Sequence, residues 1–453
     1  MAIIAPFKGL TYNFETVDDL SKVVAPPYDV ISEDEQEAFY QADPFNVIRL
    51  VLGKKKIGDS DWDNRYTRSA DVFRQWESED ILVRSDRPSM YITSLTFHPG
   101  DGGPPRIRWG LIALVRIEEE DSDVILPHER TFSAHREDRL KLMKASSAQF
   151  SQIFALYEDS ENRVGDFLKS AIEAPPEITF DFKDGASHQM WTVQNQSIIR
   201  QVSEALHERS IFIADGHHRY ETSRNYRNSM MARYEHRPSD RSYEYVMMYL
   251  TNMDDPGLTI LPSHRLIKDC AGFQLAPFLE ELKQWFEISE LPSEAMNREH
   301  DPRALKEWLD ENSDTTSAMG FRHHGEDKIY LFLLKPGMRD KTGEDLEPPL
   351  KKLDVLVLSR LVLQRAMGLS KADMDNEEKF HYESDMLKAL SMVDSGAYQM
   401  AFFINPTKMK QVKEVASNSL VMPRKSTYFY PKTLTGLVFN RIDPHEFIQV
   451  PKI

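Results

Sequence analysis

The sequence contains a single cysteine, Cys270, among 453 residues. This count excludes an internal disulfide framework and a cysteine-rich metal site. Apolar residues nowhere run for the ~18–20 positions that a transmembrane helix requires. The N-terminus also lacks the charged start and long apolar stretch of a secretory signal. We therefore expect a cytoplasmic protein without a membrane-spanning helix.

Basic runs are equally scarce, since residues 54–56 (Lys-Lys-Lys) form the only stretch of three. The chain has 72 acidic and 56 basic residues, which gives a formal net charge of −16. Proteins that bind nucleic acid usually carry a basic stripe that displaces phosphate counterions. The charge balance therefore disfavours nucleic acid as a partner, although a small phosphate pocket needs only a few cations.

The length exceeds that of one ordinary core and predicts more than one domain. Helical and strand-like patterns alternate and include hairpins, so we predict an α/β architecture of the mixed α+β kind with mixed sheets. Four parts are expected: an N-terminal α+β region (1–125), a catalytic core (126–270), an additional α+β region (271–421) and a C-terminal segment that packs back on the site (422–453).

Local signals predict individual elements. Ser32 and Glu35 have the spacing of a capping box at the start of a helix. Two strand-like stretches, 89–97 and 107–117, flank a segment rich in proline and glycine, which predicts a hairpin.

The strongest candidate for chemistry is the run Asp-Gly-His-His-Arg-Tyr-Glu-Thr at residues 215–222. The apolar stretch 211–214 predicts a buried strand, and residues 219–234 predict a helix. A glycine turn between strand and helix exposes the first helical N–H groups, where the helix dipole adds positive potential. This pattern favours a phosphate site.

Each residue of this turn has a plausible role. Gly216 allows the backbone to approach a ligand closely, and Asp215 can cap the helix. His217, His218 and Arg219 supply donors, with arginine suited to bidentate phosphate contacts. The structural alternative is that Asp215 only caps the helix and the histidines lie on the surface.

A second cluster, His128, Glu129 and Arg130, follows an apolar stretch. A glutamate held near a cation is a plausible general base for a hydroxyl or a water. The alternative is a charged loop held by ion pairs.

Weaker candidates are spread along the chain, and each has a structural alternative. They are Tyr28 and Asp29 after a double proline, Arg265 after an apolar strand, and a basic, hydroxyl-bearing and aromatic stretch near the C-terminus with Lys425, Ser426, Thr427 and Lys432. Cations and hydroxyls suit a phosphate group, and aromatic rings can stack on a base. This last stretch lacks the glycine spacing of a P-loop.

A protein-held metal ion is an alternative use of the histidines. The available ligands are His128, His217, His218, His264, Asp215 and Glu129. No two of these histidines have the i, i+4 spacing of a His-Glu-x-x-His helix. Mg²⁺ that arrives with a nucleotide is therefore the simpler expectation.

Together these segments resemble a widespread prokaryotic family known as domain of unknown function 1015. The matching stretches are residues 26–30, 46–50, 126–131, 138–140, 215–222, 261–266 and 422–437. The Asp-Gly-His-His-Arg motif is similar to that of nucleotide-binding proteins with the ParB/sulfiredoxin fold. Those proteins include kinases that phosphorylate free L-serine with ATP or ADP.

The resemblance implies a ParB/sulfiredoxin-like core and a set of roles. Phosphates would be bound by Gly216, His217 and Arg219, joined by Arg265, Lys425, Ser426, Thr427 and Lys432. The catalytic residues would be Glu129 as base, His218 and Asp215, with Asp29 or Asp215 as alternative bases. The substrate would contact His128, Arg130, Tyr28 and Asp29.

The expected function is a small-molecule kinase that uses ATP or ADP with Mg²⁺ and has a hydroxyl metabolite as partner, with free L-serine as one candidate. Two alternatives stay open. One is a phosphatase or metal-dependent hydrolase, which would act on phosphate esters without added nucleotide. The other is a non-enzymatic ParB-like module that binds nucleotide or associates with DNA.

Overall fold

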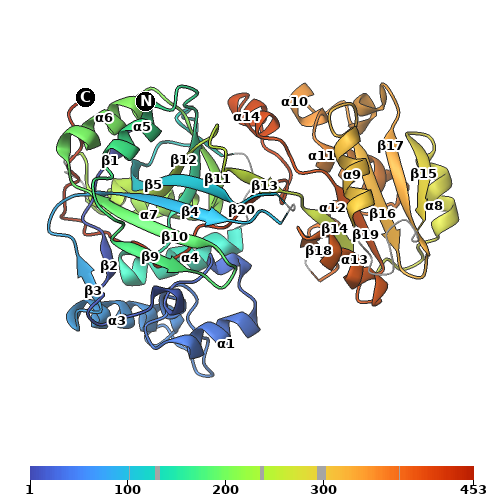
Figure 1. The fold of residues 1–453 in the computed structure, drawn as a ribbon. Helices are drawn as coiled ribbons and strands as arrows, with labels where there is room; N and C mark the ends of the chain where they lie inside the picture. Colours follow the sequence, from blue (N-terminus) through green and yellow to red (C-terminus); the bar gives the residue numbers. More distant parts are fainter. Residues whose placement is uncertain (101–102, 128–132, 235–238, 293–301, 377) are drawn as a thin grey trace. The chain divides into compact units, whose positions relative to one another are not determined.

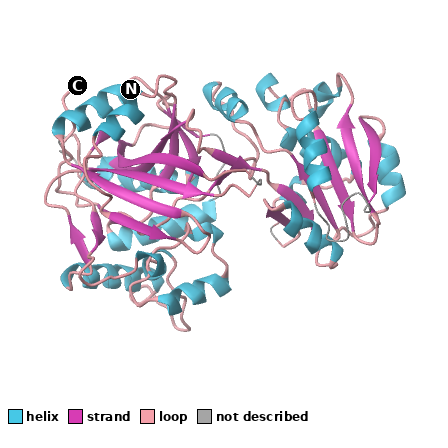
Figure 2. Cartoon of the chain, in the orientation of Figure 1, coloured by secondary structure: helices cyan, strands magenta, loops and turns pink. Residues whose placement is uncertain are grey.

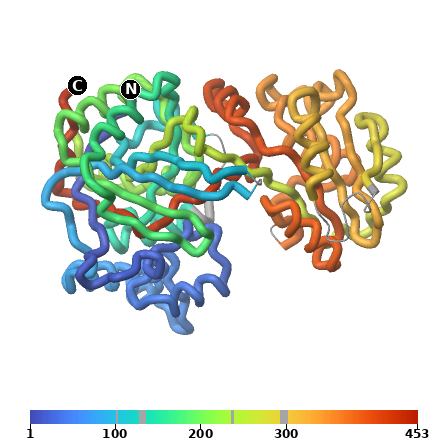
Figure 3. The backbone as a smooth tube through the Cα atoms, in the orientation of Figure 1, coloured from blue at the N-terminus to red at the C-terminus, as the bar shows by residue number. Residues whose placement is uncertain are grey.

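The computed structural model describes residues 1–100, 103–127, 133–234, 239–292, 302–376 and 378–453. These residues form two compact units, one of residues 1–259 with 430–453 and the other of residues 260–429. The chain thus leaves the first unit once and returns to it for its last residues, drawn in red at the C-terminus in Figure 3. Each unit combines helices and strands, which confirms the predicted mixed α+β class (Figure 2).

A mixed sheet forms the centre of the first unit. Its strands follow the order β6–β11–β8–β12–β5–β4–β10–β9, and β1 pairs with β5 (Figure 1). The strands are β1 (Ile4–Ala5), β4 (Met90–Phe97), β5 (Arg106–Arg116), β6 (Ile125–Pro127), β8 (Ile153–Tyr157), β9 (Ile178–Asp181), β10 (Ser187–Val193), β11 (Ile211–Asp215) and β12 (Tyr245–Asn252).

The predicted boundary at residue 125 does not separate two units, because strands from both sides of it share this sheet. β5 pairs antiparallel with β4, as the predicted hairpin requires, and on its other side with β12. β6 and β11 run parallel, with Pro127 opposite Ile213. The predicted boundaries at 270 and 421 likewise differ from the observed changes of unit at 259/260 and 429/430.

Helices and short strands complete the first unit. They are α1 (Glu33–Ala42), α2 (Ile48–Val51), α3 (Arg65–Ser78), α4 (Ser133–Ser146), α5 (Arg163–Ser170), α6 (Gln196–His207), α7 (His217–Arg233), β2 (Leu10–Tyr12), β3 (Leu82–Arg84), β7 (Ala148–Gln149) and β21 (Asn440–Arg441). The predicted capping box of Ser32 and Glu35 is present at the start of α1. In α6, Ile199, Val202 and Leu206 recur at helical spacing and pack into the core of the sheet.

The second unit has an antiparallel sheet in the order β15–β17–β16–β19–β14–β18. Its strands are β14 (His264–Ile267), β15 (Phe286–Pro292), β16 (Ala318–His323), β17 (Lys328–Leu334), β18 (Phe380–Glu383) and β19 (Met400–Ile404). Successive residues of β19 belong to two different apolar clusters, so both faces of the sheet are covered.

Helices supply that cover. α8 (Leu275–Leu282), α11 (Asp354–Val357), a π-helix (Leu358–Ala366) and α14 (Met409–Ser417) contribute to one cluster, and α9 (Arg303–Asn312) and α13 (Met386–Asp394) contribute to the other. The short helices α10 (Pro348–Lys351) and α12 (Lys371–Met374) also belong to this unit, whereas the strands β13 (Thr259–Leu261) and β20 (Tyr428–Tyr430) span the changes of unit. Among the described residues, no helix is long and apolar enough to cross a membrane.

Candidate active site

The turn between β11 and α7 has the predicted strand–glycine–helix geometry. β11 ends at Asp215, and α7 begins at His217. Gly216 occupies the N-cap position with φ 94° and ψ 27°, a left-handed conformation that favours glycine. Gly216 has no side chain with which to cap the first N–H groups of α7. A helix start of this kind is suited to an anionic ligand, because its N–H groups and the helix dipole face the turn.

Asp215 does not cap the helix, contrary to the expectation from its position. Its Oδ2 accepts a hydrogen bond from Arg219 Nη2 at 2.8 Å, and its Oδ1 accepts one from Lys432 Nζ at 2.9 Å. Donors that carry a full positive charge attract the carboxylate more strongly than neutral N–H groups do, which explains why it turns toward the cations. Burial raises the pKa of Asp215, but the charges of Lys432 and Arg219 outweigh burial and hold that pKa well below its ordinary value.

Arg219 folds back over the glycine turn. Besides its bond to Asp215, Nη1 donates to the carbonyl of Gln152. A Cβ atom at position 216 would lie 2.9 Å from Arg219 Cζ, inside normal contact distance. The left-handed backbone thus favours glycine at position 216, and an added Cβ would displace the Arg219 guanidinium.

Lys432 reaches this turn from the far end of the sequence, 217 residues away. It lies in the part of the C-terminal segment that returns to the first unit. The structure therefore brings together four of the predicted site residues: Asp215, Gly216, Arg219 and Lys432.

A small cavity adjoins Arg219. Its volume is about 50 Å³, and its lining includes Tyr28, Arg139, Arg219, Thr222 and Ser223. The Tyr28 ring lies under the Arg139 guanidinium, with Cζ 4.0 Å from the ring centroid. Burial raises the pKa of the Tyr28 hydroxyl to about 12. Tyr28 thus joins the predicted phosphate residues, whereas the neighbouring Asp29 is exposed and does not line this cavity.

A second charged cluster borders the same cavity. Asp138 forms ion pairs with both Arg65 and Arg139, and Tyr66 Oη donates to Asp138 Oδ1 at 2.6 Å. Arg139 Nη1 also donates to the carbonyl of Val51 at 2.6 Å. The sequence does not predict Arg65 and Tyr66 as site residues, because neither stands in a recognisable motif.

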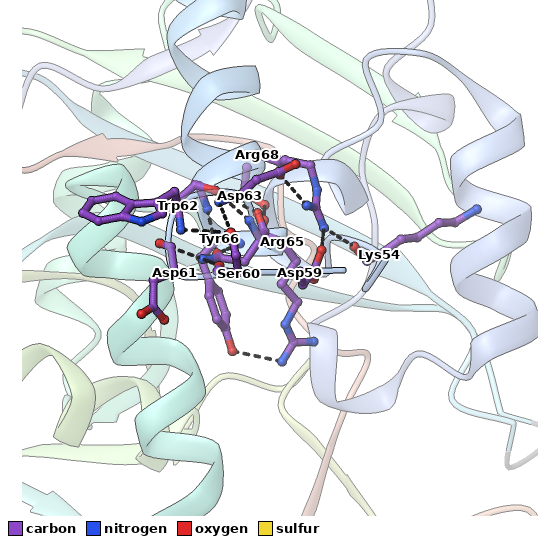
Figure 4. Close-up of polar contacts among 12 residues, drawn as sticks. Lys54, Asp59, Ser60, Asp61, Trp62, Asp63, Arg65, Tyr66 and Arg68 are labelled. Atoms are coloured by element: carbon purple, nitrogen blue, oxygen red, sulfur yellow. Dashed lines mark hydrogen bonds and ion pairs between the residues drawn. The ribbon is translucent and has the colours of Figure 1, made fainter. Parts of the chain in front are cut away.

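The start of α3 is held by a polar network that places Arg65 and Tyr66. Figure 4 shows Arg68 bonded to Asp59 and Asp63, at 2.8 and 2.6 Å, while Arg65 and Tyr66 lie beside each other. Arg68 also donates to the carbonyl of Lys54 at 3.0 Å. These bonds fix the first turn of α3, from which both side chains extend to Asp138.

The remaining predicted residues fall into three groups. His128, Glu129 and Arg130 fall outside the residues that the structure describes. His217 is buried and His218 half-buried in the first turn of α7. Arg265, Lys425, Ser426 and Thr427 belong to the second unit, where Arg265 Nη2 donates to the Lys425 carbonyl at 3.0 Å.

His264, one of the ligands considered for a metal, is fully buried, and burial followed by the charge of Arg265 lowers its pKa to about 3. Within the described ranges, no group of three or more histidine, cysteine or acidic side chains is arranged to hold a metal ion.

A family model described as "Protein of unknown function (DUF1015)" matches residues 4–356. The chain belongs to this family. The match includes the whole β11–α7 turn and both charged clusters except Lys432, which lies beyond its end. The search of curated proteins found no match.

Several solved structures share some similarity with the chain. One is free serine kinase in complex with AMP, at 12% identity, 70% coverage of this chain, 86% coverage of that chain and a TM-score of 0.34. A mutant of free serine kinase in complex with ADP has 12% identity, coverages of 73% and 91% and a TM-score of 0.36. A conserved hypothetical protein from Pyrococcus furiosus has 12% identity, coverages of 70% and 90% and a TM-score of 0.32.

Proposed function

We propose that the first unit binds nucleotide phosphates at the Gly216 turn and transfers a phosphoryl group from ATP or ADP to a hydroxyl metabolite. The observation that carries this proposal is the gathering of cations at a helix start whose N-cap residue is glycine. Arg219 and Lys432 both pair with one carboxylate, Asp215. Arg65 and Arg139 likewise both pair with Asp138.

This local concentration of cations contrasts with the net charge of −16 of the whole chain. Guanidinium and ammonium groups held near a helix start are the usual partners of phosphate. Phosphoryl transfer also depends mainly on positioning and on neutralising charge at the transferring group. The cluster supplies both requirements.

The cavity beside Arg219 limits how the ligand fits. A volume of about 50 Å³ holds a few water molecules, and sites for drug-sized ligands usually measure ~300–1,000 Å³. We expect one phosphate group to enter between Arg219 and Arg139, while the rest of the nucleotide lies outside this cavity. Mg²⁺ would arrive with the nucleotide, coordinated by phosphate oxygens and water.

Glu129 is proposed as the general base. β6 ends at Pro127, two residues earlier, and lies beside β11, which leads directly into the Gly216 turn. The hydroxyl oxygen of the acceptor would form a bond to the terminal phosphorus of the nucleotide as the bond to the bridging oxygen breaks. The hydroxyl proton would pass to the Glu129 carboxylate, and the leaving nucleotide would keep the electron pair.

Free L-serine is the proposed acceptor, because the Asp-Gly-His-His-Arg motif resembles that of ParB/sulfiredoxin-fold proteins, which include free serine kinases. The test is to incubate the protein with Mg²⁺, L-serine and either ATP or ADP, and to follow O-phosphoserine by ³¹P NMR. We expect His218→Ala and Glu129→Gln to abolish the product. Lys183→Met, which removes an exposed lysine that pairs with Glu35 at 3.4 Å and lies over the Phe39 ring, should leave it unchanged.

Two outcomes would contradict this proposal and favour another function. Release of inorganic phosphate from phosphate esters without nucleotide would indicate a hydrolase. Nucleotide binding without any phosphorylated product from a pool of hydroxy amino acids would indicate a binding module.

A further inference from the structure

Arg108 in β5 is a buried cation without a carboxylate partner among the described residues. Its side chain is 0% exposed, and its hydrogen bonds go to a hydroxyl and a carbonyl. Nε donates to Tyr249 Oη at 3.3 Å and Nη1 to the carbonyl of Tyr430 at 3.2 Å. The guanidinium also lies over the Phe154 ring, with Cζ 4.8 Å from its centroid.

Arg108 lines a cavity of about 20 Å³. Three buried atoms from residues that line it have no hydrogen-bond partner in the described structure: Arg108 Nη2, Gln152 Oε1 and His188 Nε2. Arg108, Gln152 and His188 are 0%, 1% and 7% exposed, so bulk water does not solvate them. Among the described residues, no acidic side chain lines the cavity.

Sheet register builds this arrangement. His188 in β10 lies opposite Leu95 in β4, and Leu95 lies opposite Arg108 in β5, so the three side chains share one face. Tyr249 reaches Arg108 because Gly110 leaves room for its ring: a Cβ at Gly110 would lie 2.2 Å from Tyr249 Cζ. The sheet register therefore brings Arg108 and His188 to one cavity, which Thr433, Leu434 and Leu437 of the C-terminal segment also line.

The electrostatics of the cavity favour an anion. Arginine keeps its proton at every physiological pH, and an uncompensated buried charge is unfavourable. Burial and the nearby charge of Arg108 lower the pKa of His188 to about 3, so the ring is neutral and a donor only through N–H. Asp255 interacts electrostatically with Arg108. Its carboxylate oxygens, however, accept hydrogen bonds from the backbone N–H groups of Gly257 and Trp109.

We propose that this cavity binds one small monovalent anion, of the size of chloride, between Arg108 Nη2 and His188 Nε2–H. A volume of about 20 Å³ admits one such ion and excludes a phosphate ester or nucleotide. A bound water would satisfy the same hydrogen-bonding atoms but would leave the charge of Arg108 uncompensated. This site is distinct from the proposed phosphate site, with which it shares no cavity-lining residue among those described.

The anion would stabilise the position of the segment that carries Lys432. Arg108 holds the carbonyl of Tyr430, and Gln152 Nε2 donates to the carbonyl of Leu434 at 2.8 Å. These two carbonyls flank Lys432, which reaches Asp215. Filling the cavity therefore stabilises the C-terminal segment on the first unit, whatever reaction the protein catalyses.

Two measurements on the full chain test the proposal. Crystals grown with sodium bromide should show an anomalous difference peak within about 3.5 Å of Arg108 Nη2. In solution, the melting temperature should rise by several degrees with sodium bromide or chloride and then saturate, relative to sodium gluconate at equal ionic strength.

Variants separate the anion site from general salt effects. Arg108→Met should remove the halide-dependent rise, and His188→Phe, which keeps a ring against Phe180, should weaken halide binding about tenfold. Arg116→Met is the matched control, because Arg116 lies on the same strand and pairs with Glu118. No bromide peak, or an equal halide response in His188→Phe and wild type, would show that the cavity holds only water. These two results decide the question even if Arg108→Met does not fold.

Discussion

At the scale of single residues, Asp215 shows how a local preference yields to distant charges. An aspartate just before a helix commonly accepts the first free N–H groups. Here both carboxylate oxygens of Asp215 accept hydrogen bonds from Lys432 and Arg219, and Gly216 occupies the N-cap position of the helix. The local sequence predicts the turn and its glycine, but it contains no information about a lysine 217 residues away.

Gly216→Ala should destabilise the protein more than a simple loss of flexibility predicts. The left-handed backbone disfavours any L-residue by ~1–2 kcal/mol, and the new Cβ would also displace Arg219. Gly185→Ala is the matched control, because Gly185 has φ +80° and no atom lies within 4 Å of the place that an added methyl group would take. Urea unfolding should give a larger loss of free energy for Gly216→Ala. Equal losses would contradict the close approach of Arg219.

At the scale of elements, sequence patterns predict features that depend on neighbouring residues. The capping box of α1, the β4–β5 hairpin and the β11–α7 turn all follow from short-range signals. The order of strands does not, because pairing of β5 with β12 joins segments more than a hundred residues apart. The Arg65–Asp138 pair and the Arg108 cavity could not be predicted either, because residues far apart in the sequence form them.

His264 in β14 should make stability depend on pH. Its native pKa of about 3 lies below the unfolded value of about 6.5, so the unfolded state gains the proton first as pH falls. Stability is therefore fully present above pH 6.5 and decreases toward pH 3, by roughly 2 kcal/mol at pH 5.

His264→Asn tests this dependence, because asparagine offers an acceptor to the Ile404 N–H but does not titrate. Urea unfolding at pH 5, 7 and 8 should show a smaller loss between pH 7 and 5 for the variant. Both proteins should change equally between pH 7 and 8. Parallel curves over the whole range would mean that the native pKa of His264 is close to its unfolded value.

At the scale of the whole molecule, the chain is divided into a continuous and a discontinuous unit. Residues 260–429 are contiguous and contain their own sheet with apolar clusters on both faces. The first unit requires residues 430–453 in addition to 1–259. The regions predicted from sequence differ from this division, because composition does not reveal that the chain returns to an earlier fold.

This division predicts different results for two shortened chains. Residues 260–429 alone should fold and unfold cooperatively, as a domain with its own core does. A chain that ends at residue 429 lacks Tyr430, Lys432 and Leu434, and its first unit should have a lower melting temperature. Calorimetry measures both. A non-cooperative 260–429 fragment, or an unchanged first unit in the shortened chain, would contradict the division.

Phosphate binding at the Gly216 turn is the central claim, and isothermal titration calorimetry with ADP, ATP and pyrophosphate, with and without Mg²⁺, tests it most directly. We expect saturable binding of at least one nucleotide by the wild-type protein. Lys432→Met should weaken that binding about tenfold or more through loss of one charge-assisted hydrogen bond, and Lys183→Met should not. Absence of binding by every phosphate ligand, or equal affinities of the wild-type protein and Lys432→Met, would contradict the claim.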